Sequence, residues 1–158
     1  MPRSYWVETL GCPKNQVDSD KLTGTMLADG LVPADSADAA DLVVVNTCAF
    51  VEEAREEPIA TILAIDDLRA DGSKLVVTGC MAERYGDELA AALPEVDEVS
   101  GFGIPVTLGT KPSGPLAVAA EAVPSLDLLN LPRPRSERPW AYVKVAEGCD
   151  KACGFCAI

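Results

Sequence analysis

Asp41-Leu42-Val43-Val44-Val45-Asn46, followed at once by Thr47-Cys48, is the most informative segment of this 158-residue chain. The run is short, rich in β-branched residues and almost continuously apolar, which is typical of a strand buried on both faces of a sheet. Runs of the same kind occupy residues 5–10 and 74–78, and a Gly-Cys pair follows each of them. The chain therefore repeats one arrangement three times: an apolar strand that ends next to a cysteine.

Helix-like segments separate these runs. Apolar residues recur at helical spacing over 17–29, over a segment that ends near Ala70, and over 81–93, where Pro94 stops the pattern. The residues expected on buried helix faces are Leu22, Met26 and Leu27 in the first segment and Ile59, Ile62, Leu63 and Leu68 in the second. Pro58 either marks the start of the second helix or kinks a longer one. Strands that alternate with helices predict an α/β fold with a parallel sheet and right-handed crossovers. Residues 31–33 and 96–100 are candidates for two further short strands.

Cys12, Cys48 and Cys80 each lie within two residues of the carboxyl end of an expected strand. In open parallel sheets, ligands bind outside the carboxyl ends of the strands, so three loops would bring three thiols to one edge. The helix N-termini that follow these loops favour thiolate over thiol. We therefore expect a metal site on these three cysteines, in preference to three separate structural thiols.

Three more cysteines stand close together in the segment Cys149-Asp150-Lys151-Ala152-Cys153-Gly154-Phe155-Cys156. Thiolates are the usual ligands of iron–sulfur clusters, and three of them on a four-iron cluster leave one iron open for a substrate or cosubstrate. A zinc site is the weaker interpretation, because structural zinc sites usually close four ligands and the chain has no histidine. A chance group of structural cysteines is the remaining alternative.

Composition limits the partners and the compartment. Residues 1–110 carry 7 Lys and Arg against 20 Asp and Glu, a net charge of −13, whereas residues 111–158 have a net charge of +1. This acidic first domain disfavours direct nucleic-acid binding and suits a basic protein partner, or simply aids solubility. Residues 1–9 lack the apolar run of a signal peptide, and no stretch is long enough to span a membrane, so we expect a cytoplasmic protein. In that compartment six cysteines indicate ligands or catalytic thiols more readily than disulfides.

The amino-acid composition changes after residue 104. Seven of the 12 prolines fall within residues 105–139, which we interpret as an extended linker with a basic end at Arg133, Arg135 and Arg138. Three arginines in a linker can contact nucleic acid or acidic protein, but are more often simply solvated. Residues 140–146 alternate in polarity and predict a strand leading into Cys149. We thus expect an α/β domain over 1–104, a linker over 105–139, and the start of a second, truncated domain over 140–158.

Four motifs together resemble the methylthiotransferases of the radical S-adenosylmethionine (SAM) superfamily. They are Gly11-Cys12-Pro13-Lys14-Asn15-Gln16-Val17-Asp18-Ser19, Asn46-Thr47-Cys48, Thr78-Gly79-Cys80-Met81-Ala82 and Glu147-Gly148-Cys149 through Cys156. The resemblance covers nearly all of the chain and implies two 4Fe–4S clusters. An auxiliary cluster would be bound by Cys12, Cys48 and Cys80 of the N-terminal domain. The cluster that binds SAM would be held by Cys149, Cys153 and Cys156, at the first strand of a TIM-like radical SAM barrel.

Pro13-Lys14-Asn15 after the first cysteine resembles the branch of the family that modifies ribosomal protein S-twelve of the small subunit. This branch adds a methylthio group to the β-carbon of an aspartate in that protein. A 5′-deoxyadenosyl radical made from SAM abstracts the hydrogen, and the auxiliary cluster supplies the sulfur. The implied partners are ribosomal protein S-twelve as substrate and a flavodoxin- or ferredoxin-like electron donor.

The chain also departs from the family. Most of the barrel and the C-terminal domain are absent, so we expect a truncated N-terminal fragment that is inactive by itself. Asp20 stands where Glu is commoner, and Pro58 falls where the family has an uninterrupted helix. Two other functions stay open: a tRNA methylthiotransferase acting on a modified adenosine next to the anticodon, and a non-catalytic cysteine-rich module for metal storage, redox or zinc binding. The tRNA branch tends to carry Gln-Met-Asn after its first cysteine.

Overall fold

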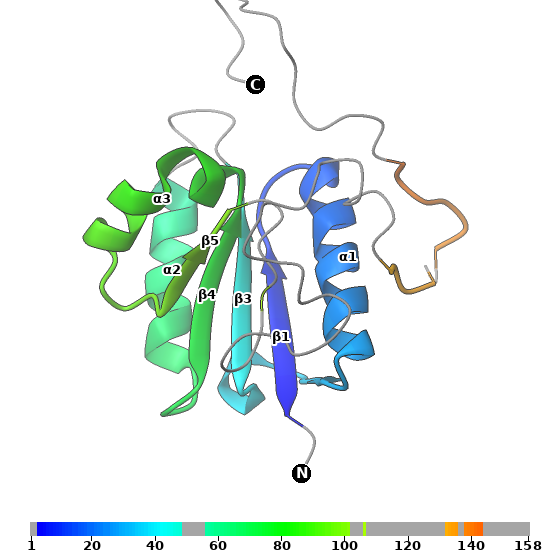
Figure 1. Ribbon diagram of the computed structural model, residues 1–158, viewed down its shortest axis with the longest axis horizontal. Helices are drawn as coiled ribbons and strands as arrows, with labels where there is room; N and C mark the ends of the chain where they lie inside the picture. Colours follow the sequence, from blue (N-terminus) through cyan, green and yellow to red (C-terminus); the bar gives the residue numbers. More distant parts are fainter. Residues whose placement is uncertain (1–2, 49–55, 102–105, 107–131, 136–137, 144–158) are drawn as a thin grey trace, which may run out of the picture.

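Strands and helices alternate along the chain, as the sequence predicts (Figure 1). The computed structural model describes residues 3–48, 56–101, 106, 132–135 and 138–143. The elements are β1 (Ser4–Thr9), α1 (Pro13–Ala28), β2 (Val32–Pro33), the 3-10 turn η1 (Ala37–Ala39), β3 (Leu42–Thr47), α2 (Glu56–Leu68), β4 (Lys74–Gly79), α3 (Cys80–Ala92) and β5 (Glu98–Ser100).

The five strands form one parallel sheet in the order β2-β1-β3-β4-β5. Every residue of β3 is buried, because this strand has a partner on each side and helices over both faces. The chain runs from β1 outward to β2 and then returns to the other side of β1 to form β3. The order therefore reverses between β1 and β3, which is the topological switch point of such a sheet.

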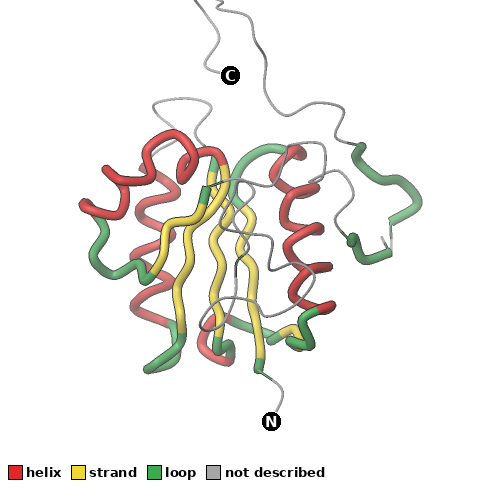
Figure 2. The backbone as a smooth tube through the Cα atoms, viewed as in Figure 1, coloured by secondary structure: helices red, strands yellow, loops and turns green. Residues whose placement is uncertain are grey.

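The helices cover both faces of the sheet (Figures 1 and 2). Successive side chains of a strand point to opposite faces, and the core divides accordingly. Leu42 and Val44 of β3 pack with Met26 of α1 in one cluster. Val43 and Val45 pack with residues of α2 and α3 in the other. This three-layer α/β arrangement confirms the fold class that the sequence predicts.

The helix faces differ in part from the expected ones. Met26 is buried and Leu22 partly buried, but Leu27, Leu63 and Leu68 are exposed on helix surfaces where we expected buried ones. Adjacent residues of a helix are about 100° apart, so Leu27 points away from the sheet where its neighbour Met26 faces it. α1 begins at Pro13 rather than at Val17. Proline suits this first position, because the ring fixes a helical φ and the missing N–H has no partner there anyway.

Pro58 is the third residue of α2, and its side chain is buried. Glu56 and Glu57 precede it in the first turn, where negatively charged side chains stabilise a helix by interacting with the positive end of its dipole. Residues 49–55, which would distinguish a helix start from a kink in a longer helix, lie outside the described residues, so both interpretations of Pro58 stay predictions.

Little of the expected linker and second domain falls within the described residues. Residues 140–143, the described part of the strand expected over 140–146, have no strand assigned, so the structure does not confirm it there. The domain boundaries after residues 104 and 139 stay predictions. In the described part of the chain, helices are too short or too polar to cross a membrane.

Candidate metal centre

Cys12, Cys48 and Cys80 follow the carboxyl ends of β1, β3 and β4, as the sequence predicts. Cys12 is the N-cap residue of α1, Cys48 directly follows β3, and Cys80 is the first residue of α3. All three are free thiols, with Cys12 exposed and the other two partly buried. Because β1, β3 and β4 are neighbours in a parallel sheet, the three thiols share one edge of it. Two of them flank the switch point between β1 and β3, where sheets of this topology bind ligands.

Two glycines let these loops approach one another closely. Gly11 has φ +103°, and a Cβ built on it would lie 2.4 Å from the Cβ of Cys48. Gly79 has φ +97° and ψ −164°, a conformation open essentially to glycine alone. A Cβ at Gly79 would lie 2.3 Å from Oδ1 of Asn46 and 2.4 Å from the carbonyl oxygen of Thr47. The loops of Cys12 and Cys80 therefore each depend on a residue without a side chain.

A buried polar network joins the loops of Cys12 and Cys48. The side-chain amide of Asn15, only 1% exposed, donates to the carbonyl oxygen of Leu10 at 2.8 Å. Nδ2 of Asn46 donates to the backbone oxygen of Asn15 and to Oγ of Ser19, both at 2.9 Å. Thr9 donates to the same Ser19 oxygen at 2.7 Å. These bonds satisfy polar groups that would otherwise be costly to bury, and they hold the start of α1 against the ends of β1 and β3.

The loop of Cys80 is connected to the same hydrogen-bond network. Thr47 Oγ1 donates to the carbonyl oxygen of Thr78 at 2.7 Å, tying the end of β3 to the end of β4. The thiol of Cys80 lies 3.9 Å from Oδ1 of Asn15, which accepts its weak hydrogen bond. Asn15, Asn46 and Thr47 stand in the quoted motifs, but the sequence predicts no individual role for them. The available signal was the appearance of Asn and Thr at the end of an otherwise apolar buried strand.

The charges of Cys12 and Cys48 act on the pKa of Cys80, so the three thiols lie close enough to interact electrostatically. Burial raises the pKa of the Cys80 thiol, and the positive charge of Lys14 opposes this rise. Negative charge on Cys48, Asp18 and Cys12 raises the pKa of Cys80 further. Three thiolates at this edge would therefore need a bound cationic group to offset their mutual repulsion.

The donor set, three free thiols carried by three loops, is of the type that an iron–sulfur cluster uses. Among the described residues, no three Cys, Asp or Glu side chains gather closely enough to hold one ion. A four-iron cluster places each thiolate on a different iron, so its ligands can come from one short segment or from separate loops around it. Three free thiols on three loops of one sheet edge have this arrangement. Cys149, Cys153 and Cys156 of the second expected cluster lie outside the described residues.

Comparison with known proteins gives consistent results. Residues 4–101 match the model of the family described as "Uncharacterized protein family UPF0004". The chain is 41% identical over 168 residues to "Ribosomal protein uS12 methylthiotransferase RimO" of Myxococcus xanthus (strain DK1622), which covers 99% of this chain and 34% of that protein. It is 43% identical over 160 residues to the protein of the same name from Desulfitobacterium hafniense (strain Y51), covering 96% of this chain and 36% of the relative. For the relative from Kineococcus radiotolerans the identity is 41% over 192 residues, 99% of this chain and 40% of that protein. The chain thus spans little more than a third of the length of these curated relatives.

Proposed function

The chain belongs to the family described as "Uncharacterized protein family UPF0004", and from this membership and its curated relatives we propose that it acts in methylthio transfer to ribosomal protein uS12. Protein uS12 is the ribosomal protein S-twelve named in the sequence analysis. The proposed acceptor of the methylthio group is the β-carbon of an aspartate in that protein. The observation that carries the proposal is the delivery of Cys12, Cys48 and Cys80 to one sheet edge by three neighbouring strands.

In this proposal Cys12, Cys48 and Cys80 hold a 4Fe–4S cluster. When bound by three cysteines, such a cluster supplies one iron with an open coordination position. The protein's own part is to position the three thiols. Asn15, Asn46 and the two glycines hold the loops together. Burial raises the pKa of the Cys80 thiol, contrary to the effect expected from the helix N-terminus that follows, so its thiolate form depends on the bound group.

Cys149, Cys153 and Cys156 are proposed to hold the second 4Fe–4S cluster, at which SAM binds. The acidic surface of residues 1–110 supports a basic ribosomal protein as substrate, because opposite charges favour encounter. A flavodoxin- or ferredoxin-like protein is the proposed electron donor, and the cytoplasm, where ribosomal proteins are found, is the proposed compartment.

Anaerobic reconstitution tests the first cluster. We expect about four irons and four sulfides per site on the wild-type chain, and the Cys12/Cys48/Cys80→Ala variant should lose one such site while keeping its far-UV circular dichroism. A Cys149/Cys153/Cys156→Ala variant is the matched control and should retain the first site. Equal iron in the wild type and the first variant would refute the assignment of Cys12, Cys48 and Cys80.

The substrate needs a separate test. The intact mass of uS12 from ribosomes of the native host should fall by one methylthio group when the gene is deleted, and return when it is restored. An unchanged uS12 mass, with loss of a methylthio group from tRNA in the same cells, would replace uS12 by tRNA as the substrate. The iron measurement would still stand in that case.

A further inference from the structure

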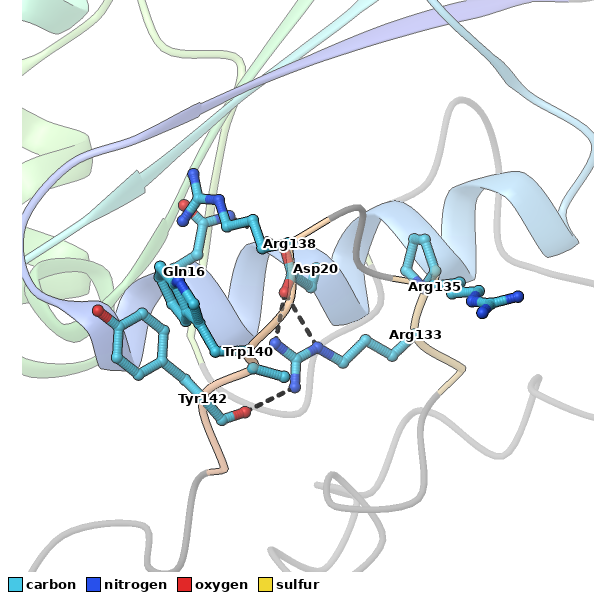
Figure 3. A pocket seen from close by; sticks show the side chains of 9 residues that line it. Gln16, Asp20, Arg133, Arg135, Arg138, Trp140 and Tyr142 are labelled. Carbon is cyan, nitrogen blue, oxygen red and sulfur yellow. Dashed lines mark hydrogen bonds and ion pairs between the residues drawn. The ribbon is translucent and has the colours of Figure 1, made fainter.

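The described residues 132–135 and 138–143, here called the strap, run along the outer side of α1 (Figure 3). Arg133 donates through Nε and Nη2 to Oδ2 of Asp20, at 2.9 and 2.6 Å. The other carboxylate oxygen of Asp20 accepts a hydrogen bond from Nε2 of Gln16 at 3.0 Å. Both oxygens of Asp20 are therefore engaged, and Gln16 holds the carboxylate in place for Arg133. Arg133 is thus an anchored residue rather than a simply solvated one.

A glycine of α1 lets the backbone of the strap come close to the helix. Gly24 stands one turn after Asp20 and is buried. A Cβ built on Gly24 would lie 2.1 Å from the carbonyl oxygen of Pro132, and the three atoms nearest to it all belong to Pro132 and Arg133. Any side chain at this position would therefore push the strap away. Glycine weakens a helix interior relative to alanine, so α1 carries a destabilising residue at the point where the strap lies against it.

The guanidinium of Arg133 also holds the strap together. Its Nη1 donates to the backbone oxygen of Tyr142 at 2.8 Å, so one side chain connects α1 with two parts of the strap (Figure 3). A planar guanidinium can make these contacts because its donors point in fixed and different directions, which the single ammonium of lysine does not reproduce. The side chains of Arg133 and Asp20 are 28% and 29% exposed, so water screens their ion pair only in part.

The place of this anchor in the chain limits where the second group of cysteines can lie. Cys149 follows Arg133 by 16 residues, but it follows Gly101, next to the end of β5, by 48 residues. A chain spans at most about 3.5 Å per residue, so these segments reach no further than about 55 Å and about 170 Å. Asp20 lies about 12 Å along α1 from Cys12. Anchoring at Arg133 therefore reduces the maximum reach of Cys149 to about a third.

We propose that the strap is an intramolecular clamp, with Asp20 and Gly24 of α1 as its docking site and Arg133 as its positioning residue, which keeps the cysteines of residues 149–156 within reach of those on the sheet edge. A shorter tether raises the effective concentration of one group at the other. The benefit to the reaction rests on the proposed function, in which both groups of cysteines bind clusters. The clamp itself belongs to the metal-free chain and can be measured there.

A distance measurement between two spin labels tests the clamp on the full chain. The labels are attached to non-natural amino acids at Leu68 and Val143, which are exposed, so that all cysteines stay unmodified. The wild type should give one narrow distance distribution. Arg133→Ala should increase the population outside it about fivefold, the upper end for an ion pair of this kind. The matched control is Arg135→Ala, since Arg135 lies in the strap but forms no ion pair within the described part of the chain.

Substitutions on α1 test the docking site from the other side. Asp20→Asn removes the charge and should broaden the distance distribution, whereas Asp20→Glu keeps the carboxylate and should leave it narrow. Gly24→Ala should also broaden it, because the methyl group displaces Pro132. If the strap were not docked, Gly24→Ala would leave the distances unchanged and would only increase the folding equilibrium constant, by about two- to fivefold.

Three outcomes would overturn the clamp. The first is a wild-type distribution as broad as that of Arg133→Ala, and the second is a narrow distribution that survives Arg133→Ala or Gly24→Ala. The third is a loss of urea stability in Arg133→Ala that accompanies the broadening, because Arg133 would then act on the fold rather than on the position of the strap. None of these measurements involves iron, so their failure would leave the proposed function untouched.

Discussion

Gly79→Ala is the substitution that most directly tests how the cysteine loops are held together. Gly79 ends β4 immediately before Cys80, at φ +97° and ψ −164°. Any other residue must adopt a conformation that L-amino acids avoid, and its Cβ must also displace Asn46 and Thr47 of the adjacent strand. Both Asn46 and Thr47 are buried, so neither can move into solvent without losing hydrogen bonds.

The expected cost has two parts. A non-glycine residue in this backbone conformation costs about 1–3 kcal/mol. Overpacking against buried neighbours adds about 1–3 kcal/mol. The substitution should therefore lower the free energy of unfolding by about 2–6 kcal/mol, a large part of the 5–15 kcal/mol that is typical of a domain.

Substitutions at two other glycines separate the cost of the backbone conformation from the cost of overpacking. Gly72 has φ +82° but open space around its Cβ position, so Gly72→Ala should show the conformational cost alone, about 1–2 kcal/mol. Gly86 follows a kink in α3, where Tyr85 has the non-helical angles φ −128° and ψ 24°, and it has open space around its Cβ position and no positive φ. Gly86→Ala should therefore stabilise the protein by about 0.4–1 kcal/mol, by restricting the unfolded chain. Urea unfolding followed by far-UV circular dichroism measures all three variants on one scale.

The comparison between Gly79→Ala and Gly72→Ala shows whether the close contacts of Gly79 add to the loss of stability. If both cost the same, the close contact of Gly79 with Asn46 and Thr47 contributes nothing, and the packing argument fails. If Gly79→Ala costs more, as we expect, it should also impair iron loading at Cys80, because the loop can accommodate the methyl group only by moving. Gly72→Ala, at the opposite end of β4, should load iron normally.

Two further substitutions test the hydrogen bonds that connect the strands. Thr47→Val keeps the side-chain shape but removes the buried hydrogen bond to Thr78, so the free energy of unfolding should fall by about 1 kcal/mol. Thr61→Val is the control: it removes an exposed hydrogen bond on α2 and should lower the free energy of unfolding much less. Equal effects of the two substitutions would contradict the role of burial. Partial burial raises the pKa of the Asp97 carboxyl, but hydrogen bonds from the Leu75 amide and Arg69 outweigh it and bring the pKa below its ordinary value of 3.8. The stability from this lowered pKa is therefore fully present above that ordinary value and is lost as the pH falls through the folded-state pKa. Urea unfolding across pH should show Asp97→Asn less stable than the wild type at neutral pH, with a difference that narrows in acid; a difference that stays constant with pH would contradict the assignment.

Local sequence pattern was sufficient for much of the architecture. The apolar runs of β3 and β4 predict central strands, because a strand buried on both faces must be apolar throughout. Once the strands are known to be parallel, the cysteines after them must share one edge, since all carboxyl ends lie on the same side. The common placement of Cys12, Cys48 and Cys80 was therefore predictable before any contact was known.

The long-range contacts were not predictable in this way. Nothing near Asn15 in the sequence indicates that it contacts the ends of β1 and β3 and the thiol of Cys80, because its partners lie up to 65 residues away. The exposure of Leu27 and Leu68 depends on which face of each helix packs against the sheet, and several faces contain apolar residues. Arg133 lies 113 residues from its ion-pair partner Asp20, so this contact forms only once the chain has folded. Local periodicity specifies strands, helices and the loops that carry the thiols, whereas the polar bonds that hold these loops together arise from three-dimensional packing.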